Sequence, residues 1–338
     1  MSKKRRKKNR EYKVHAGLDA LMDIVKSTKN SPKAWIDFLE DIKTAMKKVG
    51  CKAGGNTEPW FRGHSRSDYK LIPSLLRYLE KPDKPKNWDK VFDLESDLFW
   101  EFASRARELH GVIEDDWDIL STMQHYLTPT RLLDWTEILG VAIYFAILGV
   151  NDGKSKGSKD GDVKIGPPPC IWVLNPYRLN HESGWGAFDK KKSMADLVYP
   201  ANLGWDKKSK SYYSYGDLLT EGYMDWKWPV AIYPRQRNAR VHAQRGWFTI
   251  HGDKFVPIEE IKGHKKYAQK VELPFAAVPE ARKFLEASGI NHYLLFADLE
   301  SLSLHLMEKN GYLTRSQAEV RIKQRLDRRN VPGSVPRQ

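Results

Sequence analysis

The sequence predicts an α+β fold with a central mixed or antiparallel sheet flanked by helices. Short runs with strand character and longer runs of helical period follow one another without strict alternation, which argues against a parallel sheet built from βαβ units. Hydrophobic residues make up 41% of the 338 residues, including 12 Trp, 15 Tyr and 12 Phe, so the chain can bury a large core.

The first half of the chain is predicted to be mainly helical. Apolar residues recur at helical spacing in 17–25 and in 31–46, where Ser31 is the expected cap and Pro32 occupies the first turn. A short strand at 60–63 ends at a glycine. Further helices are expected at 91–109, 117–126 and 136–150.

The second half carries most of the predicted strands. They are expected at 170–174, 230–233, 246–250, 270–273 and 293–296, with helices at 279–287 and 299–307. Residues 151–169 have the composition of an exposed loop, and 180–227 that of an insertion. We therefore expect one domain over 12–310. A charged helix and tail over 311–338 should follow it, with 319–329 extending outward.

The formal net charge of +14 favours an anionic partner. Seven basic residues, which equal half of this excess, lie in a tail over residues 1–11 that has no apolar pattern. The tail is either an arm that binds nucleic acid or a solvated terminus. Its basic residues are Lys3, Lys4, Arg5, Arg6, Lys7, Lys8 and Arg10.

Several classes of protein are disfavoured. With Cys51 and Cys170 alone, a disulfide framework is not expected. No apolar run reaches the length of a membrane span and no signal peptide follows the basic start, so we expect a cytoplasmic protein with no membrane partner. The sequence has no phosphate-binding glycine loop and no serine-hydrolase elbow. It also has no histidine spacing typical of metal sites, so no metal is expected.

Residues 123–136 combine polar chemistry with core packing. His125 and Tyr126 offer an acid or base beside a stacking ring, and a turn at Pro129 places polar groups before a buried segment. If the segment is helical, Arg131 and Asp134 share one face as an ion pair. Alternatively, Asp134 or Thr136 caps the following helix.

Two arginine-containing blocks flank this segment. Arg62 precedes Gly63, an arrangement that suits a phosphate or carboxylate, although a structural salt bridge explains Arg62 equally well. Alternate residues from 240 to 248 would share one side of a strand that lines a pocket, with Gly246 clearing space for a ligand, or they would face solvent. These residues are Arg240, His242, Gln244, Gly246 and Phe248.

Together these blocks resemble the FRG domain family, named for the triplet Phe61-Arg62-Gly63. The resemblance runs over 26–309 and includes 73–77, 123–126, 130–136, 240–248 and 289–300. It implies a polar signature carried by Arg62, Gln124, His125, Arg131, Asp134, Arg240 and Gln244.

The FRG arrangement is similar to that of ADP-ribosyltransferases, including toxins and phage-defence effectors. This similarity implies NAD as substrate, with Arg62, His125, Tyr126, Asp134 and Gln244 in catalysis. It implies cofactor contacts from Arg62, Gly63, Gln124, Arg131, Arg240, Gly246 and Phe248. Such transferases place a glutamate on a late strand, where this chain has Gln244 and Arg245, so Glu95 or Asp134 would have to supply the acid.

Three functions remain open on the sequence. The chain is a transferase that modifies nucleic acid or protein, a non-catalytic module that binds nucleic acid, or a module that senses a ligand. An antitoxin or another defence protein is a further candidate partner. Loss of NAD turnover on Arg62→Ala would favour the first, and salt-steep binding that depends on residues 1–10 the second.

Overall fold

A computed structural model of the chain describes residues 33–51, 57–79, 89–110, 113, 115–150, 166–185, 197–206, 211–221, 226–233 and 239–328. The basic tail, the helix expected at 17–25, the Ser31 cap and most of the loop over 151–169 lie outside these ranges.

The core of the fold is a six-stranded antiparallel sheet with the order β6-β7-β2-β1-β3-β8. Its central strands come from the polar blocks and its outer strands from later segments. The strands are β1 (Trp60–His64), β2 (Leu132–Thr136), β3 (Cys170–Leu174), β6 (Val230–Ile232), β7 (Gly246–Ile250) and β8 (Ala268–Glu272). The α+β prediction, with an antiparallel sheet and flanking helices, is confirmed.

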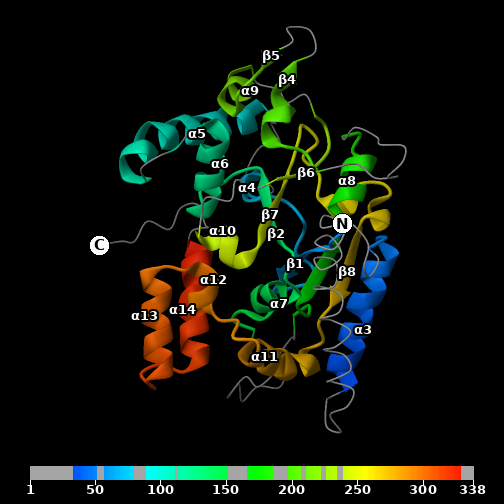
Figure 1. The fold of residues 1–338 in the computed structure, drawn as a ribbon, viewed down its shortest axis with the longest axis vertical. Helices are drawn as coiled ribbons and strands as arrows, with labels where there is room; N and C mark the ends of the chain where they lie inside the picture. The colour runs from blue at the N-terminus through cyan, green and yellow to red at the C-terminus, as the bar shows by residue number, and fades with distance from the viewer. Residues whose placement is uncertain are drawn as a thin grey trace, which may run out of the picture.

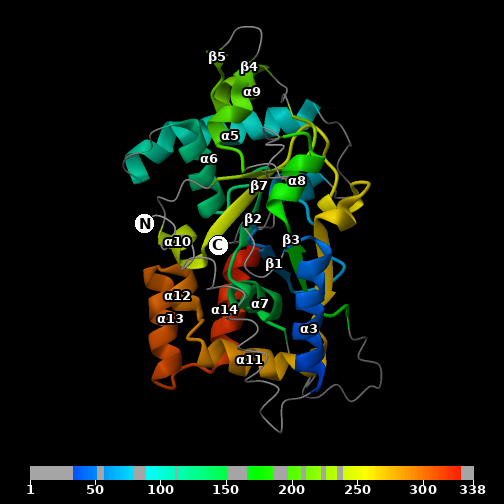
Figure 2. The ribbon, with the colours of Figure 1, turned by 45° about the vertical axis from the view of Figure 1, so that its right-hand side comes forward.

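Helices gather at the two ends of this sheet (Figures 1 and 2). At one end lie α5 (Asp89–His110), α6 (Asp116–His125) and α9 (Tyr215–Glu221), with α4 (Ser74–Leu79) close to the strands. At the other end lie α11 (Val278–Ala287), α12 (His292–Phe296), α13 (Leu299–Lys309) and α14 (Arg315–Arg328). Beside the sheet run α3 (Lys33–Lys48) and α8 (Pro176–Glu182), while α7 (Leu139–Ile147) packs on β1.

The alternation of side chains along the strands separates two apolar layers. Phe61, Ile171 and Val173 face the layer formed with α3, α7 and α11. Trp60 and Trp172, which alternate with them, face a second layer that also contains Tyr267. Part of 180–227 contributes to the core, because Leu203, Tyr215 and Trp226 pack in one apolar cluster with residues of α5 and α6. A two-stranded ribbon of β4 (Trp205–Asp206) and β5 (Ser211–Tyr212) projects from this region.

Two predicted elements have a different structure, and the structure settles an alternative that the sequence left open for a third segment. Residues 293–296 form helix α12, because Asn291 caps it by accepting a hydrogen bond from the amide of Leu294. Residues 240–248 are not one strand: α10 (Ala239–Gln244) comes first and β7 begins at Gly246. The reversal between them occurs at Arg245, which has a φ of 42°. Residues 132–136, for which the sequence left a helix open, form a strand, because β2 pairs along its length with β7.

The C-terminal helix also differs from the prediction. Instead of extending outward, α14 buries Ala318 and Ile322 against its neighbours. Glu319 forms an ion pair with Arg282 of α11, and Arg325 forms one with Asp298, the capping residue of α13. The charged composition of α14 is therefore used for attachment to the domain.

The glycine of the Phe61-Arg62-Gly63 triplet serves helix packing. A Cβ at Gly63 would lie 1.9 Å from the backbone oxygen of Ala142 and 2.7 Å from the backbone nitrogen of Ala146, both in α7. The space without a side chain is therefore filled by α7. This differs from the expectation that the glycine lets a ligand approach.

We predict that Gly63→Ala destabilises the protein by about 3 kcal/mol, because backbone atoms of α7 would have to move. Gly246→Ala is the matched control: its new Cβ would meet Val241 Cγ1 at 3.4 Å, an ordinary contact. Urea unfolding of both variants measures the difference. Equal stability of the two would show that α7 does not need the glycine.

Candidate functional site

The sheet is opened at its centre, between β1 and β2. The two strands share one residue pair, Phe61 with Thr136, whereas β1 pairs along its full length with β3. A cavity of about 280 Å³ lies at the opening, and consecutive residues 61–65 all line it. Because neighbouring strand residues point to opposite faces, lining by all of them indicates a gap between the strands.

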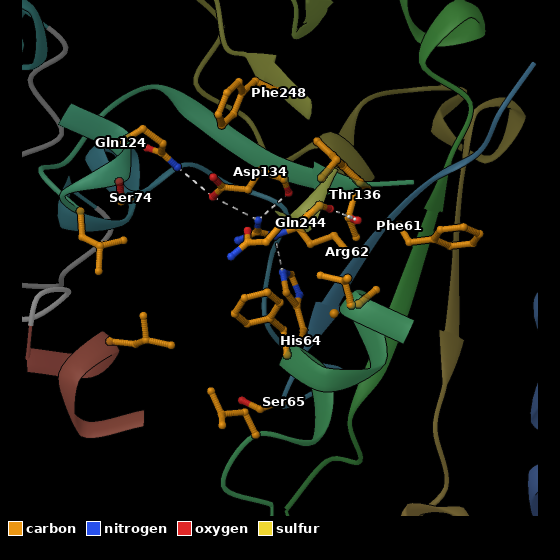
Figure 3. A pocket seen from close by; sticks show the side chains of 18 of the residues that line it. Phe61, Arg62, His64, Ser65, Ser74, Gln124, Asp134, Thr136, Gln244 and Phe248 are labelled. Atoms are coloured by element: carbon orange, nitrogen blue, oxygen red, sulfur yellow. Dashed lines mark hydrogen bonds and ion pairs between the residues drawn. The ribbon is translucent and has the colours of Figure 1, made fainter. Parts of the chain in front are cut away.

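Arg62 bridges this gap (Figure 3). Its Nη1 donates a 2.6 Å hydrogen bond to the backbone oxygen of Asp134 on β2 and lies 3.6 Å from the carboxylate Oδ2 of the same residue. Its Nε donates to Nε2 of His64 at 3.1 Å. The other amino group, Nη2, makes no hydrogen bond to the described part of the chain, so it is available to a ligand.

Of the two β1 side chains in this bridge, Arg62 and His64, Arg62 is the charged one. Burial lowers the pKa of Arg62 to about 10, which leaves the guanidinium charged at neutral pH. Burial and the charges of Arg62 and Arg77 hold the pKa of His64 well below its ordinary value, so its ring is neutral. Because Nε2 of His64 accepts from Arg62, the neutral ring carries its proton on Nδ1.

Asp134 is oriented by a chain of polar groups from the same sequence block. The backbone amide of Leu132 donates to Thr130 Oγ1, which donates to Gln124 Oε1 at 2.5 Å. Gln124 Nε2 then donates to Asp134 Oδ2 at 2.8 Å. The Asp134 side chain is nevertheless 53% exposed, so a fixed carboxylate faces the cavity.

The remaining walls combine cations with apolar groups. Arg77 of α4 and Lys323 of α14 line the cavity with Arg62, and Asp134 is the one acid among its lining residues in the described ranges. The excess of positive charge suits an anionic ligand. The apolar wall includes Phe248, and α10 is anchored nearby because Thr136 Oγ1 donates to the Gln244 backbone oxygen and Gln244 Nε2 donates to Leu295 O.

Arg131, expected to contact the cofactor, lies inside the protein. Its guanidinium is fully buried and pairs with both carboxylate oxygens of Glu95, while Nη1 donates to the His251 backbone oxygen. Burial alone would lower the pKa of Arg131, but the Glu95 carboxylate raises it above its ordinary value. The expected pair with Asp134 is therefore wrong, and Glu95, which also accepts from Tyr215, is used structurally.

Other predicted residues are divided between the cavity and its surroundings. Gln124, His125, Gln244 and Phe248 line the cavity with Arg62 and Asp134. Tyr126 does not: its ring is 49% exposed and lines a separate groove against α5. Neither Gly246 nor Arg240 is among the lining residues, and the Arg240 side chain is outside the described part of the structure.

Sequence reasoning missed Arg77, Leu127 and Lys323, which also line the cavity. Arg77 lies in the block at 73–77, which we used for the resemblance without assigning it a role. Lys323 has no local signal, because α14 reaches the cavity through tertiary packing. Among the described residues, no group of three or more His, Cys, Asp or Glu side chains is placed to hold a metal ion.

The fold and the cavity define an α+β domain whose central sheet opens around a cavity bridged by an arginine. Residues 57–155 match the family model of the FRG domain, so the chain contains an FRG domain in this stretch. The matched stretch runs from just before β1 past α7, and supplies the whole cavity lining except Val241, Gln244, Phe248, Lys323 and Leu326. Neither a curated protein nor a solved structure matches the chain. None of the described helices is both long and apolar enough to cross a lipid bilayer.

We predict that Glu95→Ala destabilises the protein by about 3–5 kcal/mol, because it leaves the charge of Arg131 buried without its partner. Glu101→Ala on the same helix is the control, since its ion pair with Arg105 is exposed and should contribute less than about 1 kcal/mol. Chemical denaturation measures both variants. A small loss for Glu95→Ala would show that the buried pair is not required for stability.

His251, whose backbone accepts from Arg131, should make stability depend on pH. Burial lowers the pKa of its ring to about 3, so below the ordinary value of about 6.5 the unfolded chain takes up a proton that the folded chain excludes. Above pH 6.5 the His251 ring is neutral in both states and has no effect on stability. Between the two pKa values, each unit by which the pH falls lowers the free energy of unfolding by about 1.4 kcal/mol. His251→Gln should remove this dependence. Parallel slopes for the two proteins between pH 6 and 4 would contradict this assignment.

Proposed function

We propose that the FRG domain of this chain binds NAD in the cavity between β1 and β2 and transfers ADP-ribose from it to nucleic acid or protein, as a toxin or phage-defence effector. The observation that carries the proposal is the opening of the central sheet, where the Arg62 guanidinium lies beside the exposed carboxylate of Asp134. A cation for phosphate and an acid for the reacting ribose thus lie on adjacent strands.

The charges and size of the cavity support a nucleotide-type ligand. Arg62, Arg77 and Lys323 offer guanidinium and ammonium donors that suit phosphate oxygens. Phe248 and its apolar neighbours offer a surface for a ring. The volume of about 280 Å³ fits the part of NAD that reacts and leaves the rest at the open side.

Asp134 is the residue best placed for the chemistry. In the transfer, the bond between ribose C1′ and the nicotinamide nitrogen breaks and nicotinamide leaves with the bonding electrons. An acceptor oxygen or nitrogen then bonds to C1′ and loses its proton. A carboxylate at this position stabilises the positive charge that develops on the ribose and can take up that proton. The Gln124 hydrogen bond fixes its orientation.

The other proposed site residues take supporting roles. His125 lines the cavity whereas Tyr126 does not, so contact with the ribose falls to His125. The amide nitrogen of Gln244 is engaged with Leu295 O, and an amide cannot act as a base. Gln244 therefore holds the wall formed by α10, and the acid function rests on Asp134.

The test is incubation of the purified protein with adenylate-labelled NAD and RNA, DNA or protein acceptors. We expect Asp134→Asn to lower transfer by about 100-fold or more, because the amide retains the shape but not the charge. Arg62→Lys should weaken NAD binding by about tenfold, because a single ammonium replaces the guanidinium fork. The labelled fraction identifies the acceptor class.

Asp68→Asn is the matched control, because Asp68 forms an exposed pair with Arg66 outside the cavity. It should retain full activity. If the wild type neither transfers label nor releases nicotinamide, the proposal is contradicted. Salt-steep binding of nucleic acid that falls on removal of residues 1–10 would then favour a non-catalytic binding module.

A further inference from the structure

Several of the described helices end in the same way. In these helices a cap residue is followed by a residue with positive φ, and the amide after it bonds back to a carbonyl in the last turn. Glycine is the usual residue for this backbone conformation, because it has no Cβ. The glycines that end α3, α7, α8, α11 and α13 in this way are Gly50, Gly149, Gly184, Gly289 and Gly311.

Helix α6 ends in the same geometry but uses a leucine. Leu127 follows the cap residue Tyr126 and has a φ of 63°. Its amide donates to Gln124 O at 3.1 Å, and the amide of Thr128 donates to Met123 O at 2.9 Å. A branched side chain is unfavourable in this region of backbone space, so the leucine strains a turn that glycine would form freely.

The core does not account for this leucine. Leu127 belongs to none of the apolar clusters formed by the described residues. The other residues with positive φ that are not glycine, Arg245 and Ala297, carry an exposed and a small side chain respectively. Leu127 instead lines the cavity between β1 and β2.

The reversal at Leu127 also sorts the neighbouring side chains. His125 and Leu127 line the cavity, whereas Tyr126 and Thr128 line the groove against α5. A leucine side chain is thereby presented to a cavity that is also lined by cations that suit an anion. Backbone strain of this kind is found at sites where a side chain is needed in one place.

We propose that Leu127 is a specificity residue that supplies an apolar contact to the ring of the bound ligand. The ligand class is therefore a molecule with a planar ring close to a phosphate. The inference rests on the proposed function, since it concerns the same cavity and NAD carries both features. It adds an apolar ring contact on the α6 side of the cavity to the surface that Phe248 offers.

Three variants at this position separate strain from ligand contact. Leu127→Ala keeps a Cβ in the strained turn and removes the contact, and Leu127→Gly removes both. We expect the Gly variant to melt about 2–4 °C above the Ala variant, the reverse of the usual order of these residues. Leu127→Met should keep both the strain and the contact.

Calorimetric titration with NAD and with pyrophosphate then tests the contact. The Ala and Gly variants should bind NAD about tenfold more weakly than the wild type, the loss expected for one apolar side chain. Their affinity for pyrophosphate, which has no ring, should be unchanged. Leu306→Ala, a control on α13 remote from the cavity lining, should bind both ligands as the wild type does.

The outcomes distinguish this inference from the proposed function. If the wild type binds NAD and the Ala and Gly variants bind it with the same affinity as the wild type, the role of Leu127 is overturned and the proposed function stands. If the Ala variant melts at a higher temperature than the Gly variant, the inference that Leu127 strains the turn is overturned. A wild type that binds no NAD would overturn both proposals together.

Discussion

The hydrogen bond from Arg62 to the backbone oxygen of Asp134 is the interaction on which the site depends. Beyond Phe61 and Thr136 the two central strands share no ladder pairs, so a side chain replaces the backbone hydrogen bonds that would join them. A charge-assisted hydrogen bond typically contributes about 1.5–3 kcal/mol, more than a neutral one. One guanidinium can therefore hold the sheet together and keep it open. The same group presents a free Nη2 to the gap.

The two arginines of the polar signature illustrate how burial assigns roles. Arg131 is enclosed with Glu95, Tyr215 and two aromatic rings, where a charge is tolerated because it is paired. Arg62 is only partly enclosed and shares Asp134 with Gln124 and the cavity. Because the Glu95 carboxylate pairs with the buried charge of Arg131, Asp134 is not needed as the ion-pair partner of Arg131. The buried pair thus leaves an acid for the surface of the cavity.

Sequence patterns predicted the elements that have local signals. Strands at 60–63, 170–174 and 246–250 were found because their apolar runs are bounded by turns or glycine, and most of the predicted site residues do meet in one cavity. The failures depend on distant contacts. The partner of Arg131 is Glu95 in α5, and residues 132–136, which the sequence left open between helix and other structure, form a strand because β7 pairs with them. The positive φ at the turn falls on Arg245 rather than on the neighbouring Gly246, so the glycine does not mark the position of the turn.

The cavity is assembled from two sources with different consequences. The stretch that matches the FRG family model brings the bridge, the oriented acid and the strained leucine, all tied to the opening of the sheet. Later elements bring Phe248 and Lys323, which touch the cavity but take no part in the bridge. Changes in α10, β7 or α14 can therefore alter the shape and charge of the outer wall while Arg62 and Asp134 keep their geometry. Ligand preference can therefore change without a change in the chemistry, because specificity needs only a difference between the binding energies of two ligands at one wall.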